Sequence, residues 1–173
     1  MGKTKYIIKT GGLPVGTHEF EFEVTGAFFK ENEANDIRNA NINVQAELLK
    51  QNNVLQLSFD ISGTVEMECD RCLKEYNFPI HSEEKLVVKY GNPKDSDDEV
   101  LVVPEGETDL NITQQIYEFV LTALPNRKVP CEIDEEFECD EEVLSKLNQN
   151  STTDESENNP LWDKLNKIKL NKN

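Results

Sequence analysis

The sequence predicts an α+β protein built on a mainly antiparallel β-sheet, bent or partly barrel-like, with one helix packed after the sheet and a short C-terminal helix. Two observations lead to this expectation. Apolar and polar residues alternate with the period of a β-strand through most of residues 42–90. Over residues 109–124, apolar residues recur instead at helical spacing. A chain of 173 residues is long enough for one domain with a tail.

The first predicted elements are short. Residues 19–24 alternate strictly and predict a strand with one face in water. Residues 28–40 lose the alternation, which is typical of a loop or a short helix. The alternation returns at Ile42, continues to Leu48 and ends in a polar turn over residues 50–53. A further strand is therefore expected before this turn.

The longest predicted element is a hairpin. Residues 55–69 alternate without interruption, and an alternating run of the opposite phase covers residues 76–90. Because a straight strand of the first length would extend ~50 Å, too far for a domain of this size, we expect a bend at Gly63. Antiparallel pairing that sets Met67 opposite Phe78 places apolar residues opposite each other along the same face. One long bent hairpin is predicted.

The second half of the chain begins with a short strand, predicted for residues 100–103. A helix is expected over residues 109–124, since its apolar residues form one stripe and Pro125 stops it. Asn111, followed three residues later by Gln114, resembles a capping box.

The composition divides the chain into three parts. Residues 1–147 are expected to form a single α+β domain. Residues 148–159 contain no apolar residue and predict a flexible acidic and polar linker. Residues 160–173 return to helical spacing as a short, basic, amphipathic tail that holds Trp162, the only tryptophan. We expect this tail to dock through Trp162, Leu165 and Ile168 on a partner or on the protein's own body.

The net charge of −16 is unevenly distributed. Residues 104–159 hold 3 basic and 15 acidic side chains, whereas residues 160–173 hold 4 basic and 1 acidic side chain. An acidic body does not form an extended clamp for nucleic acid, but it attracts proteins rich in lysine and arginine.

Nothing in the sequence points to a membrane protein. No stretch approaches the roughly 18 apolar residues of a membrane span, and the N-terminus lacks the apolar core of a signal peptide. We therefore expect a cytoplasmic protein without a membrane partner.

Enzymatic motifs are not found either. The histidines His18 and His81 have no nucleophile motif around them, and no glycine-rich loop precedes a helix. We expect a protein that is not an enzyme and has no small-molecule substrate.

The four cysteines are the main candidate site. Cys69-x-x-Cys72 closes the predicted hairpin in the manner of a zinc knuckle, and Cys131 and Cys139 could complete a four-cysteine zinc site. The eight acidic residues within 132–142 raise thiol pKa values and disfavour the thiolate, although the charge of a metal ion can override this. Three alternatives stay open: structural zinc, free and partly buried thiols, and a redox pair.

Several motifs, taken in order, resemble one protein family. They are Gly12-Leu-Pro, Cys69-Asp-Arg-Cys-Leu, Asp109-Leu, Ala123-Leu-Pro125 and Asn159-Pro-Leu-Trp. Together they are similar to the YceD family, the large ribosomal RNA subunit accumulation proteins. The resemblance implies a non-enzymatic factor that supports accumulation of large-subunit ribosomal RNA in ribosome biogenesis.

Carried over by position, Cys69, Arg71 and Cys72 match the central motif of the family, and Trp162 and Leu165 match its terminal motif. Relatives with a dense second cysteine cluster that includes a Gly-Leu-Cys run have no full counterpart here. This departure weakens any metal site inferred from those relatives.

Two kinds of partner follow from the resemblance and the charge. The first is large-subunit ribosomal RNA or a pre-ribosomal particle. The second is a basic ribosomal protein, which an acidic binding module would hold without direct RNA contact. The candidate contact residues come from the hairpin tip, the segment after the helix and the tail: Arg71, Lys74, Arg127, Lys128, Trp162, Lys164, Leu165 and Lys167.

Overall fold

The fold comes from a computed structural model, in which residues 5–34, 36–52, 54–97 and 100–151 are described. The strands are β1 Ile7–Lys9, β2 Gly16–Thr25, β3 Asn39–Lys50, β4 Val54–Glu68, β5 Glu75–Tyr90, β6 Val100–Val103 and β7 Asp109–Asn111. The helices are α1 Gly26–Glu31, α2 Thr113–Ala123 and α3 Glu141–Ser151, with 3-10 turns η1 Pro93–Asp95 and η2 Pro130–Glu132.

Five strands form the main sheet in the order β2-β3-β4-β5-β6. The first four are antiparallel neighbours, and the short β6 runs parallel to β5. Strands β1 and β7 pair with each other in a separate two-stranded sheet. The predicted α+β class with a mainly antiparallel sheet is confirmed, and the sheet is open rather than a closed barrel.

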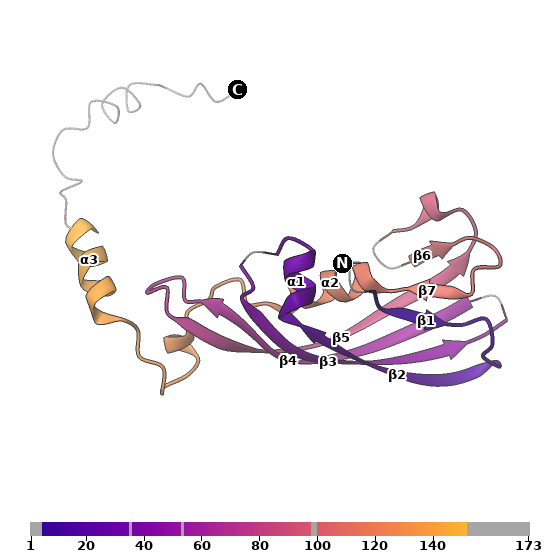
Figure 1. Cartoon of the computed structure of the whole chain (residues 1–173), viewed down its shortest axis with the longest axis horizontal. Coiled ribbons are helices and arrows are strands. Elements are labelled where there is room, and N and C mark those ends of the chain that lie inside the picture. Colours follow the sequence, from indigo (N-terminus) through magenta and orange to yellow (C-terminus); the bar gives the residue numbers. More distant parts are fainter. Residues whose placement is uncertain (1–4, 35, 53, 98–99, 152–173) are drawn as a thin grey trace, which may run out of the picture.

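The core lies on one side of the main sheet. Helices α1 and α2 and the β1–β7 pair all lie above the same face in Figure 1. Phe28 and Phe29 of α1 and Ile116 and Val120 of α2 are buried, together with the alternate apolar residues of β3, β4 and β5. Because strand side chains alternate between the two faces, the polar residues of these strands project from the other face. That face is not covered by a helix of the described chain.

The predicted hairpin exists, but its predicted register is wrong by two residues. Met67 lies opposite Tyr76 instead of Phe78, and Gly63 lies opposite Ile80. The reason is the tip, which is a tight turn closed by a hydrogen bond from the Cys69 N–H to the Lys74 carbonyl at 2.9 Å. A shift of two residues keeps every side chain on its original face, so the alternation pattern is satisfied by either register.

Gly63 lies inside β4, and strand pairing continues through it on both sides. The long strands curve gently along their length (Figure 1). Gly63 has a φ of 154°, and a Cβ added there would lie 2.2 Å from the Asn41 carbonyl oxygen of β3. The residue is therefore required both for its backbone conformation and for the close approach of the neighbouring strand.

The helices differ from expectation in two respects. Helix α2 begins only at Thr113, whose N–H donates to Asn111 Oδ1 at 3.0 Å, while Gln114 bonds Glu118 instead of reaching back. The predicted capping box is therefore wrong, because Asn111 accepts a hydrogen bond at the helix start but Gln114 does not return one. Helix α3 was not expected; the Asp140 carboxylate accepts from two N–H groups of its first turn.

Helix α3 includes residues 148–151, at the start of the segment predicted to be a linker. The rest of that segment and the predicted tail helix over residues 160–173 lie outside the described residues. Within the described ranges, no helix combines the length and apolar character needed to cross a bilayer.

We predict that Gly63→Ala destabilises the protein by ~2 kcal/mol or more, since the new methyl group would collide with the β3 backbone. Urea-induced unfolding measures the loss. Gly12→Ala is the matched control, because nothing lies within 4 Å of the added Cβ, and it should change the free energy of unfolding by less than about 1 kcal/mol. Equal stability of the two variants would contradict the packing argument.

Candidate metal centre at the hairpin tip

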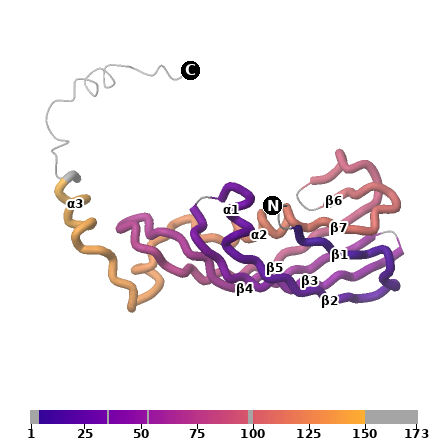
Figure 2. Tube along the Cα trace, viewed as in Figure 1, coloured from indigo at the N-terminus to yellow at the C-terminus, as the bar shows by residue number. Residues whose placement is uncertain are grey.

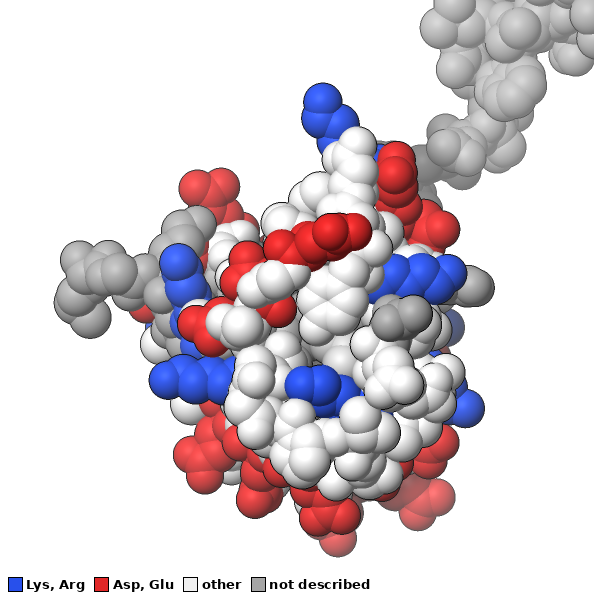
Figure 3. Space-filling view, turned by 90° about the vertical axis from the view of Figure 1, so that its right-hand side faces the viewer, with Lys and Arg blue, Asp and Glu red and all other residues white. Residues whose placement is uncertain are grey.

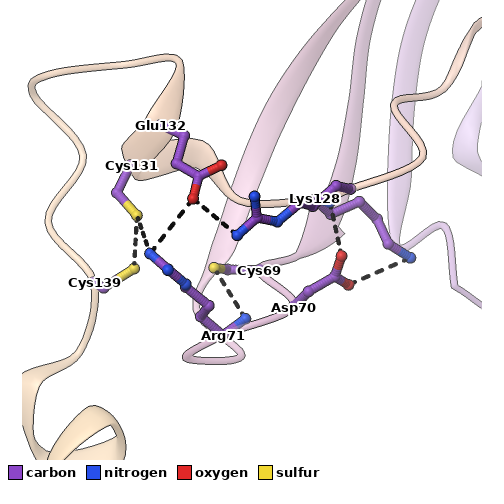
Figure 4. Close-up of polar contacts among 8 residues, drawn as sticks. Cys69, Asp70, Arg71, Lys128, Cys131, Glu132 and Cys139 are labelled. Carbon is purple, nitrogen blue, oxygen red and sulfur yellow. Dashed lines mark hydrogen bonds and ion pairs between the residues drawn. The ribbon is translucent and has the colours of Figure 1, made fainter.

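The tip of the β4–β5 hairpin lies against a segment that is distant in sequence. After α2 the chain runs back along the molecule to the hairpin tip before it enters α3 (Figure 2). This return brings Cys131 and Cys139 to the turn that holds Cys69 and Cys72 (Figure 4). The site is thus built by two stretches of chain about sixty residues apart.

Three of the cysteines form a compact cluster. The Sγ atoms of Cys69, Cys72 and Cys139 all lie within 4.8 Å of one another. The fourth sulfur, of Cys131, lies 3.2 Å from the Cys139 sulfur. Cys69 and Cys72 are buried, the other two are half-buried, and none of the four forms a disulfide.

Backbone amides support the sulfur atoms. The Arg71 N–H donates to Cys69 Sγ at 3.4 Å. Burial raises the pKa of the Cys72 thiol, but hydrogen bonds from the backbone of Asp140 and Lys74 and from the thiols of Cys69 and Cys139 together bring that pKa below its usual value. The turn and the returning segment therefore both favour the charged form of Cys72.

Cys139 behaves in the opposite way. Its hydrogen bond with Cys131, followed by burial, raises the pKa of Cys139 to about 12. The two shifts belong to one coupled group of thiols, in which Cys72 loses its proton before Cys139 does. Without a cation, the cluster accommodates one negative charge more easily than several.

The donor set fits a soft, thiophilic metal ion. Four sulfurs around a tetrahedral ion with metal–sulfur bonds of ~2.3 Å lie roughly 3.8 Å apart. The three clustered sulfurs lie within 4.8 Å of one another, close enough to converge on one ion. A divalent cation would also favour release of the protons that the cluster otherwise retains. The three close cysteines can therefore hold a metal ion.

The charges around the cluster are more balanced than the acidic sequence suggests. Arg71 Nη1 lies 3.9 Å from Cys131 Sγ and 3.7 Å from a carboxylate oxygen of Glu132. Arg127 pairs with the same carboxylate at 2.9 Å. Glu132 thus connects the two arginines, and Arg71 places a positive charge beside the sulfurs.

A second connection joins the tip to the returning segment. The Asp70 N–H donates to the Lys128 carbonyl, and the Lys128 N–H donates to Asp70 Oδ2, both at 2.7 Å (Figure 4). The Lys128 ammonium lies 4.0 Å from the same carboxylate. This reciprocal pair of hydrogen bonds, one accepted by a backbone carbonyl and one by the Asp70 carboxylate, fixes where the returning chain crosses the hairpin.

An aromatic contact holds the segment on its other side. The Phe137 ring packs edge-on against Tyr76 of β5, with centroids 5.2 Å apart, and the Lys74 ammonium lies 5.0 Å from the centre of the Phe137 ring. The Tyr76 hydroxyl donates to Asp134 Oδ2 at 3.0 Å. The residues between Cys131 and Cys139 are therefore anchored to β5 by packing as well as by polar contacts.

The model of one protein family, described as "Large ribosomal RNA subunit accumulation protein YceD", matches residues 57–169. The chain belongs to the YceD family. The match includes the β4–β5 hairpin, helix α2 and all four cysteines. Searches of curated proteins and of solved structures found no significant match.

Within the YceD match, the structure brings together only some of the candidate residues. Arg71 and Lys74 lie on the tip, while Arg127 and Lys128 lie on the segment that crosses it. The tail candidates lie outside the described residues: Trp162, Lys164, Leu165 and Lys167.

Sequence reasoning missed Leu73 at this site. Leu73 has a φ of 62° and is 64% exposed, so an apolar side chain projects from a left-handed turn position that glycine usually occupies. It lines a polar cavity of about 970 Å³ beside the tip, together with Arg38 and Glu75. The signals in the sequence were an apolar residue directly after the second cysteine of a turn and its place at the end of the Cys69-Asp-Arg-Cys-Leu motif.

We predict that Asp70→Ala lowers the free energy of unfolding by ~1 kcal/mol, because the Lys128 N–H loses its acceptor. Asp70→Asn retains a side-chain oxygen for that N–H and should recover most of the loss. Urea denaturation of both variants tests this. If the two variants are equally destabilised, the lost negative charge rather than the hydrogen bond is responsible.

Proposed function

We propose that this YceD-family chain is a non-enzymatic factor that supports the accumulation of large-subunit ribosomal RNA during ribosome biogenesis. The observation that carries the proposal is the family match over residues 57–169, because the family is named for this role. The matched region contains the cysteine-bearing hairpin tip, which makes the tip the leading candidate for the functional element.

The histidines support a role other than catalysis. His18 Nε2 lies 2.9 Å from the Pro14 carbonyl oxygen, and His81 lies 3.7 Å from Asp60 on the exposed sheet face. Neither contact sets a nucleophile beside a base, the arrangement that activates serine or cysteine in hydrolytic enzymes.

We also propose that the metal at the tip is zinc, held by Cys69, Cys72 and Cys139, with Cys131 as the fourth ligand. Zinc favours four thiolates in a tetrahedral arrangement, and such an ion would link the hairpin to the chain after α2. The N–H groups of the turn and the Arg71 guanidinium would then support the sulfurs from outside.

A basic ribosomal protein is the second candidate partner, and one observation favours it over direct RNA contact. Three of the four candidate cations near the tip have carboxylate partners: Arg71 and Arg127 share Glu132, and Lys128 lies beside Asp70. The fourth, Lys74, contacts the Glu138 carbonyl and the Phe137 ring. The carboxylates offset part of the positive charge that a phosphate backbone would need. Direct RNA binding would then depend on the lysines of the tail.

The chain is also expected to divide into three parts. We propose a folded body, a linker and a basic tail over residues 160–173, in which Trp162 acts as the anchor. The only tryptophan of a chain, placed among lysines, is typical of a docking segment.

The protein purified without added metal should contain about one zinc per chain. Elemental analysis and thiol counting before and after chelation measure this, because metal-bound thiolates react slowly. Cys72→Ser should abolish binding. Four titratable thiols in the untreated protein and no metal would eliminate the zinc site.

Cells that lack this chain should contain less large-subunit ribosomal RNA relative to small-subunit RNA. Quantification of the two RNAs by electrophoresis tests the expectation, and the wild-type gene should restore the ratio. Cys69→Ser/Cys72→Ser should restore it poorly, whereas Gly12→Ala should restore it fully. An unchanged ratio in cells without the chain would overturn the proposed function.

A further inference from the structure

The uncovered face of the main sheet is strongly acidic. Its side chains come from the exposed positions of β2 to β5, and Figure 3 shows acidic residues lining the bottom of the molecule, where this face lies. The acidic members in the middle of the face are Glu19, Glu21, Glu23, Glu47, Asp60 and Glu83.

A groove of about 580 Å³ crosses this face. One row of cross-strand neighbours beside it runs from Glu19 through Glu47 to Lys85, and the other runs from Glu21 through Asp60 to Glu83. The groove therefore extends over four strands between two rows that hold five carboxylates, two neutral polar residues and one lysine.

The strand register places like charges directly opposite each other on this face. Glu19 pairs with Glu47, and Asp60 pairs with Glu83. Such pairs destabilise a sheet because carboxylates on adjacent strands lie close together. Among the described residues, no lysine or arginine makes an ion pair with Glu19, Glu47 or Glu83.

A third like-charge pair on the same sheet is neutralised within the chain. Glu68 lies opposite Glu75, and Arg38 forms an ion pair with both carboxylates. The fold can thus supply a cation to such a pair. At the groove, His81 lies 3.7 Å from Asp60, and Lys85 lines one end without an ion pair to Glu19, Glu47 or Glu83 among the described residues. The groove is left with carboxylates that a partner's cations would neutralise.

We propose that this groove binds an extended segment of a partner protein rich in lysine and arginine. The inference rests on the second candidate function, that of holding a basic ribosomal protein, and assigns it a surface away from the cysteine cluster. A lysine or arginine side chain is long enough to lie across the groove and reach both acidic rows. Phosphates would be repelled, so RNA is not the occupant.

The proposal predicts opposite effects on stability and on binding. Replacing both unneutralised pairs, as Glu19→Gln/Glu47→Gln/Asp60→Asn/Glu83→Gln, removes repulsion and should raise the melting temperature. The same variant should lose affinity for a basic peptide, as expected when a surface is kept for binding at a cost in stability.

The test uses the full chain and a fluorescent peptide of alternating lysine and threonine, with affinity measured by fluorescence anisotropy at low salt. The groove variant should bind about tenfold more weakly or worse, since each exposed ion pair contributes modestly and four are removed. The control, Glu105→Gln/Glu135→Gln/Glu136→Gln/Glu138→Gln, removes the same charge from other exposed surfaces and should bind within about twofold of the wild type.

Equal weakening in the groove variant and the control would overturn the proposal, because attraction by net charge alone would then explain binding. It would also be overturned by a wild-type chain that does not bind the peptide, or by a groove variant that melts below the wild type. An intact peptide affinity with no effect of the chain on ribosomal RNA would leave the groove in place and overturn the proposed function only.

Discussion

The pairing register of β4 and β5 is the constraint on which the rest of the structure depends. The hydrogen bond from the Cys69 N–H to the Lys74 carbonyl closes the hairpin and holds both cysteines of the turn at its tip. The same register sets Tyr76 opposite Met67, where its ring meets Phe137 and its hydroxyl reaches Asp134. One strand pairing therefore positions both the sulfur cluster and the surface that receives the returning chain.

Much of this fold could be predicted from the sequence, because side-chain alternation determines which residues face the core. The alternation could not determine the register, since a shift of two residues leaves every face unchanged. The register is instead set by the turn, which closes between Cys69 and Lys74. In this turn Asp70 also forms contacts with Lys128 that no local sequence pattern encodes. Helix α3 was missed for a related reason: it has few apolar residues, and its clearest signal was the cap at Asp140.

The cysteine site was predicted in its residues but not in its geometry. Contact between Cys139 and the turn depends on how the chain returns after α2, a long-range feature that spacing alone does not specify. The structure also groups three sulfurs within 4.8 Å of one another, while Cys131 joins this group through Cys139, at 3.2 Å between the sulfurs, and lies 3.9 Å from the Arg71 guanidinium. The net charge of the chain likewise does not show where charges are paired in the fold. Arg71, Arg127 and Lys128 at the tip pair with carboxylates of the chain, whereas Glu19 and Glu47 on the open sheet lie opposite each other without an ion pair to a described lysine or arginine. The acidic total of the chain thus includes one surface balanced internally and another available to a partner.

We propose that a metal ion bound at the cysteine cluster links the chain after α2 to the hairpin tip. Amide hydrogen exchange of the full chain, before and after chelation, tests it most directly. We expect the amides of Asp70 and Lys128, and those of residues 131–139, to exchange faster once the metal is removed, because their contacts lose the cross-link. The amides between β3 and β4 should stay protected. Identical exchange at the tip before and after chelation would contradict the account.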